Sequence, residues 1–204
     1  VLFRSGDGKA DSKKLVKSLK REKAVLTIFS DEDQLEEFID KHERKFEKAK
    51  ANFQDLLDFE IITASDNSNQ FDASLEEVFH LISDNGYSEV YPKQFGNEKD
   101  SVIGGLMNNA RGGYFQKVPN KYPKEAYYTY DDKTCDYDCQ ITEYFYWGMT
   151  SILGGQNAPG RLEQIQDEWR LNTPAKVEVR DPELFDLLTN PKYSLPTVLP
   201  DGVI

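Results

Sequence analysis

Residues 138–153 read DCQITEYFYWGMTSIL, and this stretch decides the fold that we expect. The segment has helical spacing, and its apolar side chains occur on most sides of the helix rather than along one stripe. A helix of this kind is covered from several directions, so we expect it at the centre of the core, touching Trp169 or Leu162. The residues expected to be largely buried are Phe145, Trp147 or Met149, Ile152 and Leu153.

Helical patterns flank this segment on both sides and set the fold class. Gly, Pro and capping residues delimit helices within residues 72–86, 101–111, 161–171 and 181–190. Residues 24–29 form a short apolar run that suits a strand or the start of a buried helix. We therefore expect a mainly α fold with a few short strands, of the α+β class, in a single globular domain over residues 24–204.

A long amphipathic helix is expected over residues 31–57, because Ser30 and Asp33 form a capping signal at its start. Its apolar positions alternate in steps of four and three: Leu35, Ile39, His42, Phe46, Ala49, Phe53 and Leu56. Such a seam suits either a homodimeric coiled coil or packing of the helix on its own domain. Two large Phe side chains in the seam favour the second interpretation.

The composition limits the partners. The chain has 204 residues and a net charge of −11, so it repels phosphate backbones and acidic membrane surfaces. This argues against a nucleic-acid partner and makes cations the natural ligands, although such a charge also serves solubility alone. No run approaches the ~18 apolar residues that a membrane span requires.

The first residues predict an artificial start. Residues 1–5, VLFRS, resemble the translation of a sequencing-adaptor tail, so we interpret residues 1–23 as this scar and a polar linker. The true N-terminus is then expected to be missing. Asp7 and Asp11 resemble ligands in the second half of a short calcium loop, a kind of loop found in secreted bacterial proteins. Lys14 stands where an EF-hand has its closing acid, so this remnant is not expected to bind calcium.

The segment YDDKTCDYDC, residues 130–139, has the densest concentration of chemically active side chains. Three interpretations stay open: a disulfide-closed turn whose carboxylates bind calcium, a thiolate metal site, or an acidic loop that caps the central helix. The candidate metal ligands are Asp131, Asp132, Asp136 and Asp138.

The two cysteines of this segment are the only ones in the chain. Cys135 and Cys139 lie four residues apart in a polar stretch, where a turn can bring their Cα atoms to the ~5.5 Å that a disulfide needs. We predict a disulfide between them at the start of the central helix. A disulfide implies an oxidising compartment, so the protein is expected to be secreted or periplasmic.

Single residues outside this segment carry weaker signals. Arg111 precedes two glycines and could pair with an acid of the 131–138 turn or bind an anionic ligand, and an internal ion pair is the favoured interpretation. His42 and His80 both lie on expected helices, where most histidines serve packing. The zincin, nucleophile-elbow and phosphate-loop motifs do not occur.

Two functions follow from these observations. The leading hypothesis is a non-catalytic exported domain that binds divalent cations, calcium among them, or another macromolecule. The alternative is a hydrolase with an aromatic-lined cleft built from Tyr127, Tyr128 and Trp147. An enzyme should show these aromatic residues beside convergent carboxylates in a concave pocket, whereas a binding or structural domain should bury them fully.

Overall fold

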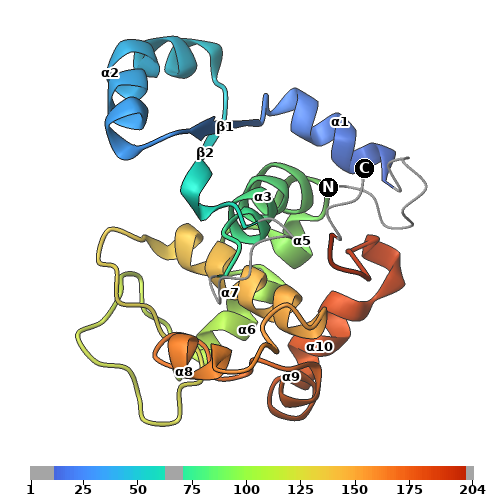
Figure 1. The fold of residues 1–204 in the computed structure, drawn as a ribbon. Helices are drawn as coiled ribbons and strands as arrows, with labels where there is room; N and C mark the ends of the chain where they lie inside the picture. Colours follow the sequence, from blue (N-terminus) through green and yellow to red (C-terminus); the bar gives the residue numbers. More distant parts are fainter. Residues whose placement is uncertain (1–11, 63–70, 201–204) are drawn as a thin grey trace.

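Helix α7 (Tyr137–Ile152) runs through the middle of the fold in a computed structural model, which describes residues 12–62 and 71–200 (Figure 1). Nearly every residue of α7 is buried, which confirms its expected central place. Burial is incomplete at its C-terminal end, where Ile152 and Leu153, which were expected to be largely buried, are only half-buried. Trp169, an expected neighbour, packs beside α7 and donates a hydrogen bond to Ser151 Oγ at 2.9 Å.

The elements before α7 combine helices with two short strands. In chain order they are α1 (Lys13–Arg21), β1 (Val25–Phe29), α2 (Glu32–Ala49), β2 (Phe53–Leu57), η1 (Asp58–Glu60), α3 (Ser74–Ile82), η2 (Ser83–Tyr87), α4 (Ser88–Val90), α5 (Pro92–Phe95) and α6 (Val102–Ala110). The η2 element is a π-helical stretch that continues α3. A mainly helical α+β fold is therefore confirmed.

The elements after α7 are short helices, and they cover its other sides. They are α8 (Arg161–Ile165), α9 (Pro174–Arg180), α10 (Pro182–Thr189) and η3 (Pro191–Tyr193). Helix α10 approaches α7 closely at Gly148, where a Cβ atom would lie 2.8 Å from Leu184 Cδ2. Only glycine leaves room for this contact, so Gly148 fixes the spacing of the two helices.

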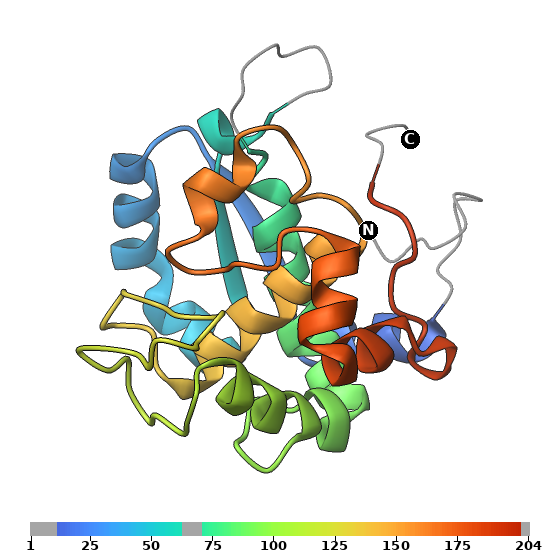
Figure 2. The ribbon, with the colours of Figure 1, turned by 90° about the horizontal axis from the view of Figure 1, so that it is seen from below.

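The two strands form a parallel pair in which Val25 lies opposite Phe53 and Phe29 opposite Leu57. Helix α2 makes the crossover between the strands, as parallel pairing requires. Figure 2 shows α2 on one side of the strands and α3 on the other.

The prediction of one long helix over residues 31–57 is therefore wrong beyond Ala49. Helix α2 ends at Ala49, because Lys50 adopts a left-handed conformation with φ 52° and turns the chain back. Residues 53–57 then pair with β1 instead of extending the helix. Pairing satisfies the backbone hydrogen-bonding groups along the shared edge of both strands. If α2 continued through residues 53–57, β1 would have no partner strand.

Four Phe rings from α2 and the two strands pack together in the region of the predicted seam. Phe46 of α2 lies 5.3 Å from Phe53 of β2 between ring centroids, and Phe38 lies 5.1 Å from Phe29 of β1. The aromatic face of α2 thus packs within its own chain. A homodimer through this helix stays a prediction, for which the structure offers no support.

Helix α1 adds to the core although it falls within the predicted linker. Leu15 is 1% exposed and belongs to the main apolar cluster, and Arg21 pairs with Glu89 at 2.7 Å. Asp7 and Asp11, the proposed remnant of a calcium loop, lie outside the described residues.

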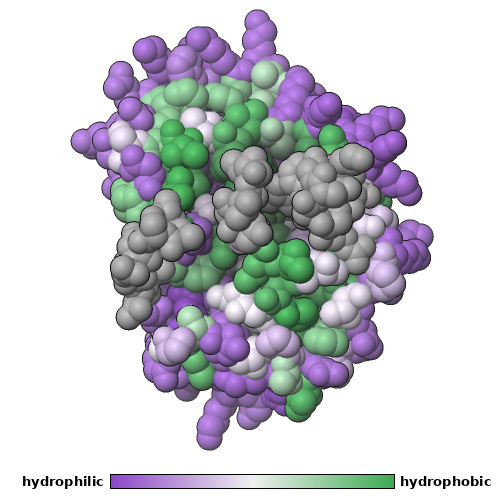
Figure 3. Space-filling view, turned by 45° about the vertical axis from the view of Figure 1, so that its right-hand side comes forward, coloured by the Kyte–Doolittle hydropathy of each residue, from purple (hydrophilic) through white to green (hydrophobic). Residues whose placement is uncertain are grey.

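Hydrophilic side chains dominate the outline of the molecule, and apolar residues gather toward the middle of the face in Figure 3. Within the described part of the chain, none of the helices combines the length and apolar character needed to cross a membrane.

Candidate metal centre

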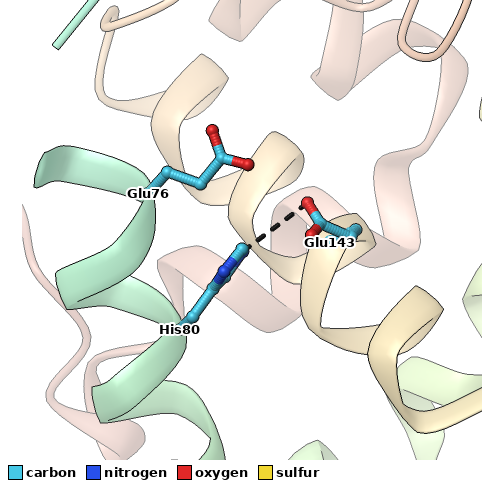
Figure 4. Close-up of side chains that lie close together, drawn as sticks. All are labelled: Glu76, His80 and Glu143. Carbon is cyan, nitrogen blue, oxygen red and sulfur yellow. Dashed lines mark ion pairs between the residues drawn. The ribbon is translucent and has the colours of Figure 1, made fainter. Parts of the chain in front are cut away.

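Helix α3 places two candidate ligands, Glu76 and His80, on one face. A spacing of four residues brings side chains together one turn apart on a helix. Glu76 and His80 extend from α3 toward α7, where Glu143 extends toward them (Figure 4). One ligating atom of each of the three residues lies within 4.8 Å of the others. Among residues 12–62 and 71–200, this is the one group of three or more His, Cys, Asp or Glu side chains to meet that distance.

The His80 ring is deeply buried, and its Nε2 atom points into the group. The side chain is 9% exposed, and Nε2 lies 3.5 Å from Glu143 Oε2. At this distance Nε2 forms an ion pair but no hydrogen bond of normal geometry with any described residue. A buried nitrogen without a hydrogen bond is costly, so the position invites an additional partner.

A second carboxylate holds the other side of the ring. Glu77 Oε2 lies 3.7 Å from His80 Nδ1 and accepts a hydrogen bond from the Gln54 side chain of β2. Metal-ligating histidines commonly have their second nitrogen oriented by a carboxylate in this way. Gln54, Glu77 and His80 thus form a chain that leads from the sheet to the centre.

The carboxylates control the protonation of the centre in the absence of a metal ion. Burial by itself lowers the pKa of His80, but the carboxylates of Glu143, Glu77 and Glu76 outweigh it and raise that pKa to about 10. Burial, followed by the charge of Glu143, raises the pKa of Glu76 to about 7. In the metal-free centre these carboxylates therefore favour the positively charged form of His80 at neutral pH.

We expect the stability of the metal-free protein to depend on pH through His80. The folded-state pKa of about 10 exceeds the unfolded value of 6.5, so the stabilisation is complete below pH 6.5 and is lost as the pH rises toward 10. The unfolding free energy should fall by up to about 1.4 kcal/mol per pH unit in this window. Urea unfolding of chelator-treated protein from pH 7.5 upward measures the slope with little contribution from Glu76. Equal slopes in the wild type and His80→Asn would contradict this assignment.

A cleft of about 1000 Å³ opens beside the centre and includes Glu76 in its wall. Its other walls carry aromatic rings, namely Tyr122, Tyr130 and Trp147, and the carboxylate of Glu168. Burial and then the charge of Glu143 raise the pKa of Glu168 to about 7. Aromatic rings and carboxylates therefore line one concavity, together with five Lys and Arg side chains.

The aromatic residues predicted to line this cleft divide between three locations. Trp147 lies in its wall, with Arg161 stacked 5.8 Å from the Trp147 ring centroid. Tyr128 is fully buried and donates a hydrogen bond to the Gln140 carbonyl at 2.7 Å. Tyr127 borders a separate, open groove of about 650 Å³. Of the three aromatic residues predicted for a cleft, the structure therefore places only Trp147 in this one, beside Tyr122 and Tyr130. An enzymatic function stays a prediction.

No protein-family model, curated protein or solved structure matches this chain. The function is therefore inferred from the chemistry of the centre. One imidazole nitrogen and two carboxylates are donors that Zn²⁺, Mn²⁺ and Fe²⁺ accept. Calcium and magnesium prefer ligand sets made of oxygen alone. The donor set of Glu76, His80 and Glu143 thus fits a transition-metal ion.

The acids of the predicted calcium turn are exposed and take different local roles. Asp132 accepts hydrogen bonds from the Thr134 amide and hydroxyl, both at 2.8 Å, which lower the pKa of Asp132. Asp136 caps α7 by accepting from the Cys139 amide at 3.3 Å. Asp131 lines the cleft. Asp138, the fourth predicted ligand, lies in the first turn of α7. Helix capping by this loop is confirmed for Asp136, and calcium binding by its acids stays a prediction.

Cys135 and Cys139 lie at disulfide distance, with Cα atoms 5.4 Å apart at the start of α7. The position agrees with the predicted turn before the central helix. We expect intact mass analysis of protein made in an oxidising compartment to show no alkylation until a reductant is added. Closing so short a loop stabilises by about 2 kcal/mol in the chain-entropy model. Two alkylations without reductant would refute the bond.

Arg111 does not form the predicted ion pair with the 131–138 turn. Its side chain is fully buried, and it donates from Nη1 to Gln140 Oε1 at 2.5 Å and from Nη2 to Asn108 Oδ1 at 2.8 Å. The guanidinium also lies over the Tyr137 ring, 5.2 Å from its centroid. Within the described ranges, none of the ion pairs involves Arg111. Neutral amides and aromatic faces replace the expected acid, and burial lowers the pKa of Arg111.

The sequence favoured a packing role for His80, and Glu76 and Glu143 were not among the predicted metal ligands. The Glu76–His80 spacing is a signal that places a carboxylate and an imidazole on one helical face. Glu143 has no such signal, because it follows from the tertiary packing of α3 on α7.

Proposed function

We propose that this chain is a divalent-metal-binding domain whose centre is Glu76, His80 and Glu143. The observation that supports the proposal most strongly is the buried His80 Nε2, which lies 3.5 Å from Glu143 Oε2 and forms no hydrogen bond of normal geometry with any residue that the structure describes. The leading sequence-based hypothesis, cation binding, is retained, but its location moves from the acidic turn to the space between α3 and α7.

Charge balance supports a bound cation. The centre brings together three carboxylates, from Glu76, Glu77 and Glu143, around one imidazole. A proton on His80 offsets only part of this charge, whereas a divalent ion offsets more of it. Metal binding requires a neutral His80, so binding is expected to displace that proton. An ion pair between His80 and Glu143 is the competing role for the centre.

The disulfide bears on the compartment in which the protein is found. Disulfides persist in oxidising environments, so Cys135–Cys139 supports an exported protein. Calcium binding by the acidic turn is a separate proposal, which a thermal melt with calcium against chelator tests. An unchanged melting temperature would leave that turn as a helix cap alone.

Calorimetric titration of chelator-treated protein tests the metal proposal. Zn²⁺ is expected to bind with one high-affinity equivalent per chain, and Mn²⁺ to compete for the same centre. His42→Asn provides a matched control, because His42 lies on α2, in contact with Phe38 and away from the centre. Absence of binding in both the wild type and the control would leave the centre as an ion-pair network.

Glu77→Gln should weaken zinc binding without abolishing it. The change keeps the size of the side chain but removes the charge that faces His80 Nδ1. Loss of an outer-shell carboxylate typically reduces metal affinity by roughly 10- to 100-fold. Competition with a fluorescent zinc chelator measures the change. An unaltered affinity would show that Glu77 does not orient the ring.

A further inference from the structure

The open groove of about 650 Å³ is formed by three segments of the chain. Residues 124–127 and residues 170–171 contribute two of its sides, and one face of helix α9 completes it. The groove adjoins the cleft beside the metal centre and shares Lys124 and Arg170 with it. It shares no residue with the three proposed metal ligands, so binding in the groove can be tested independently of zinc.

Helix α9 brings two kinds of side chain to the groove at helical spacing. Ala175 and Val179 are four residues apart, as are Lys176 and Arg180, so the members of each pair lie one turn apart on the same face. Val179 is 83% exposed, the largest exposed fraction among the exposed large apolar side chains of the described residues. The groove gains further apolar surface from Ala126, Tyr127 and Leu171. The exposed valine is therefore part of an apolar strip rather than an isolated side chain.

The groove is basic, although the chain as a whole has a net charge of −11. Lysine and arginine provide four of its lining side chains, and Glu125 is the one acid among the described residues that line it. A second acid, Asp181, neighbours Tyr127 but is buried, where it accepts hydrogen bonds from Tyr144 Oη and the Leu184 amide. The accessible surface of the groove therefore has an excess of positive charge.

Backbone carbonyl groups hold the two arginines of the groove in place. Arg170 donates from Nη1 to the Ala126 carbonyl at 2.5 Å, and Arg180 donates from Nη2 to the Glu125 carbonyl at 3.3 Å. In the part of the chain that the structure describes, none of the ion pairs includes a basic residue of the groove. The guanidinium charges are thus positioned but not offset by a carboxylate. Carboxylates form strong, charge-assisted hydrogen bonds with such groups.

We propose that the groove binds an extended peptide segment of another protein, in which acidic and apolar residues alternate. Along α9, side chains four residues apart repeat every ~6 Å. Along an extended peptide, side chains two residues apart repeat every ~6.6 Å. The two repeats agree closely enough for successive acids to approach Lys176 and Arg180 while the apolar side chains contact Ala175 and Val179.

The open shape and the surrounding charge favour a peptide over other anions. Sites for small molecules enclose most of the ligand surface, which an open groove does not do. A nucleic acid or an anionic membrane extends beyond the groove and meets the acidic remainder of the protein surface. A short peptide keeps its charge within the groove, and acids farther away than a Debye length of about 8 Å are largely screened from it.

Fluorescence anisotropy of a fluorescein-labelled, C-terminally amidated peptide of alternating Glu and Leu residues tests this proposal. We expect saturable binding to the wild type that weakens as the salt concentration rises. A peptide with Gln in place of Glu, and another with Ser in place of Leu, should each bind at least about 10-fold more weakly. No binding of the Glu–Leu peptide, or equal binding of the Gln peptide, would overturn the proposal.

Variants at exposed positions locate the peptide on the protein. Val179→Glu places a like charge against the acids of the peptide, and the double variant Lys176→Gln/Arg180→Gln removes two cations from the groove. Each should retain the fold and weaken binding by at least about 10-fold. The control Arg44→Gln/Lys48→Gln removes two exposed cations at the same spacing on α2, outside the groove, and should bind like the wild type. Equal affinities in all three variants would place the peptide elsewhere and overturn the proposal.

Other occupants of the groove give distinguishable results. Dodecanoate, single-stranded DNA and phosphatidylglycerol vesicles are tested against the same variants. Binding of any of these that Val179→Glu abolishes, without binding of the peptide, would replace the peptide as the ligand. Concentration-dependent dimerisation in sedimentation velocity that Val179→Glu abolishes would identify a second copy of the chain as the occupant. Either result would contradict peptide docking in the groove.

Discussion

Replacing His80 with Asn is expected to weaken zinc binding by at least about 100-fold, which corresponds to about 2.7 kcal/mol. His80 offers the single nitrogen donor of the centre, and its Nε2 lies 3.5 Å from Glu143 Oε2 in a buried position. The Asn side chain is shorter and cannot reach the same point with a nitrogen lone pair. Loss of a direct ligand should exceed the roughly 10- to 100-fold effect of losing an outer-shell partner.

The comparison requires a variant that changes a histidine without touching the centre. His42→Asn meets this need, because the chain has only two histidines and His42 belongs to α2. Circular dichroism should show that both variants keep the helical fold. If His80→Asn folds and binds zinc as tightly as His42→Asn, the ion lies elsewhere and the proposed centre is refuted.

Phe145→Ala is expected to lower the unfolding free energy by about 3–5 kcal/mol. Phe145 is 1% exposed, and its ring stacks on Phe95 with centroids 5.0 Å apart. It also meets Phe79 of α3 edge-on at 5.0 Å, so it joins three segments of the core. Removing the ring leaves a cavity between segments that cannot close around it without moving α7.

Phe59→Ala is the matched control for the core substitution, because Phe59 is 57% exposed. It should change the unfolding free energy by less than about 0.5 kcal/mol in the same urea titration. A loss below about 1 kcal/mol for Phe145→Ala would show that α7 does not anchor the core.

Local signals in the sequence predicted the features that depend on neighbouring residues. The all-round apolar character of residues 138–153 predicted the central helix, and Asp136 caps it as short-range chemistry requires. The spacing of Cys135 and Cys139 predicted their approach at the helix start. Each of these features is decided within a few residues, so tertiary context changes little.

Features that depend on distant partners were missed. The seam through Phe46 and Phe53 suited one long helix, but β1 required a partner strand, and pairing with residues 53–57 overrode helical periodicity. The candidate centre was missed for the same reason. Glu76 and His80 share a helix face, but Glu143 joins them only because α3 packs on α7, and that packing is not visible in the spacing of residues.

The central claim is that a divalent ion binds between α3 and α7, and anomalous diffraction from crystals grown with zinc tests it most directly. Data collected on both sides of the zinc absorption edge locate the ion without reference to the protein. A single strong peak is expected within about 2.0–2.2 Å of His80 and of carboxylate oxygens from Glu76 and Glu143. A peak at the acidic turn of residues 131–138 with none beside His80, or no ordered zinc at all, would contradict a metal centre between α3 and α7.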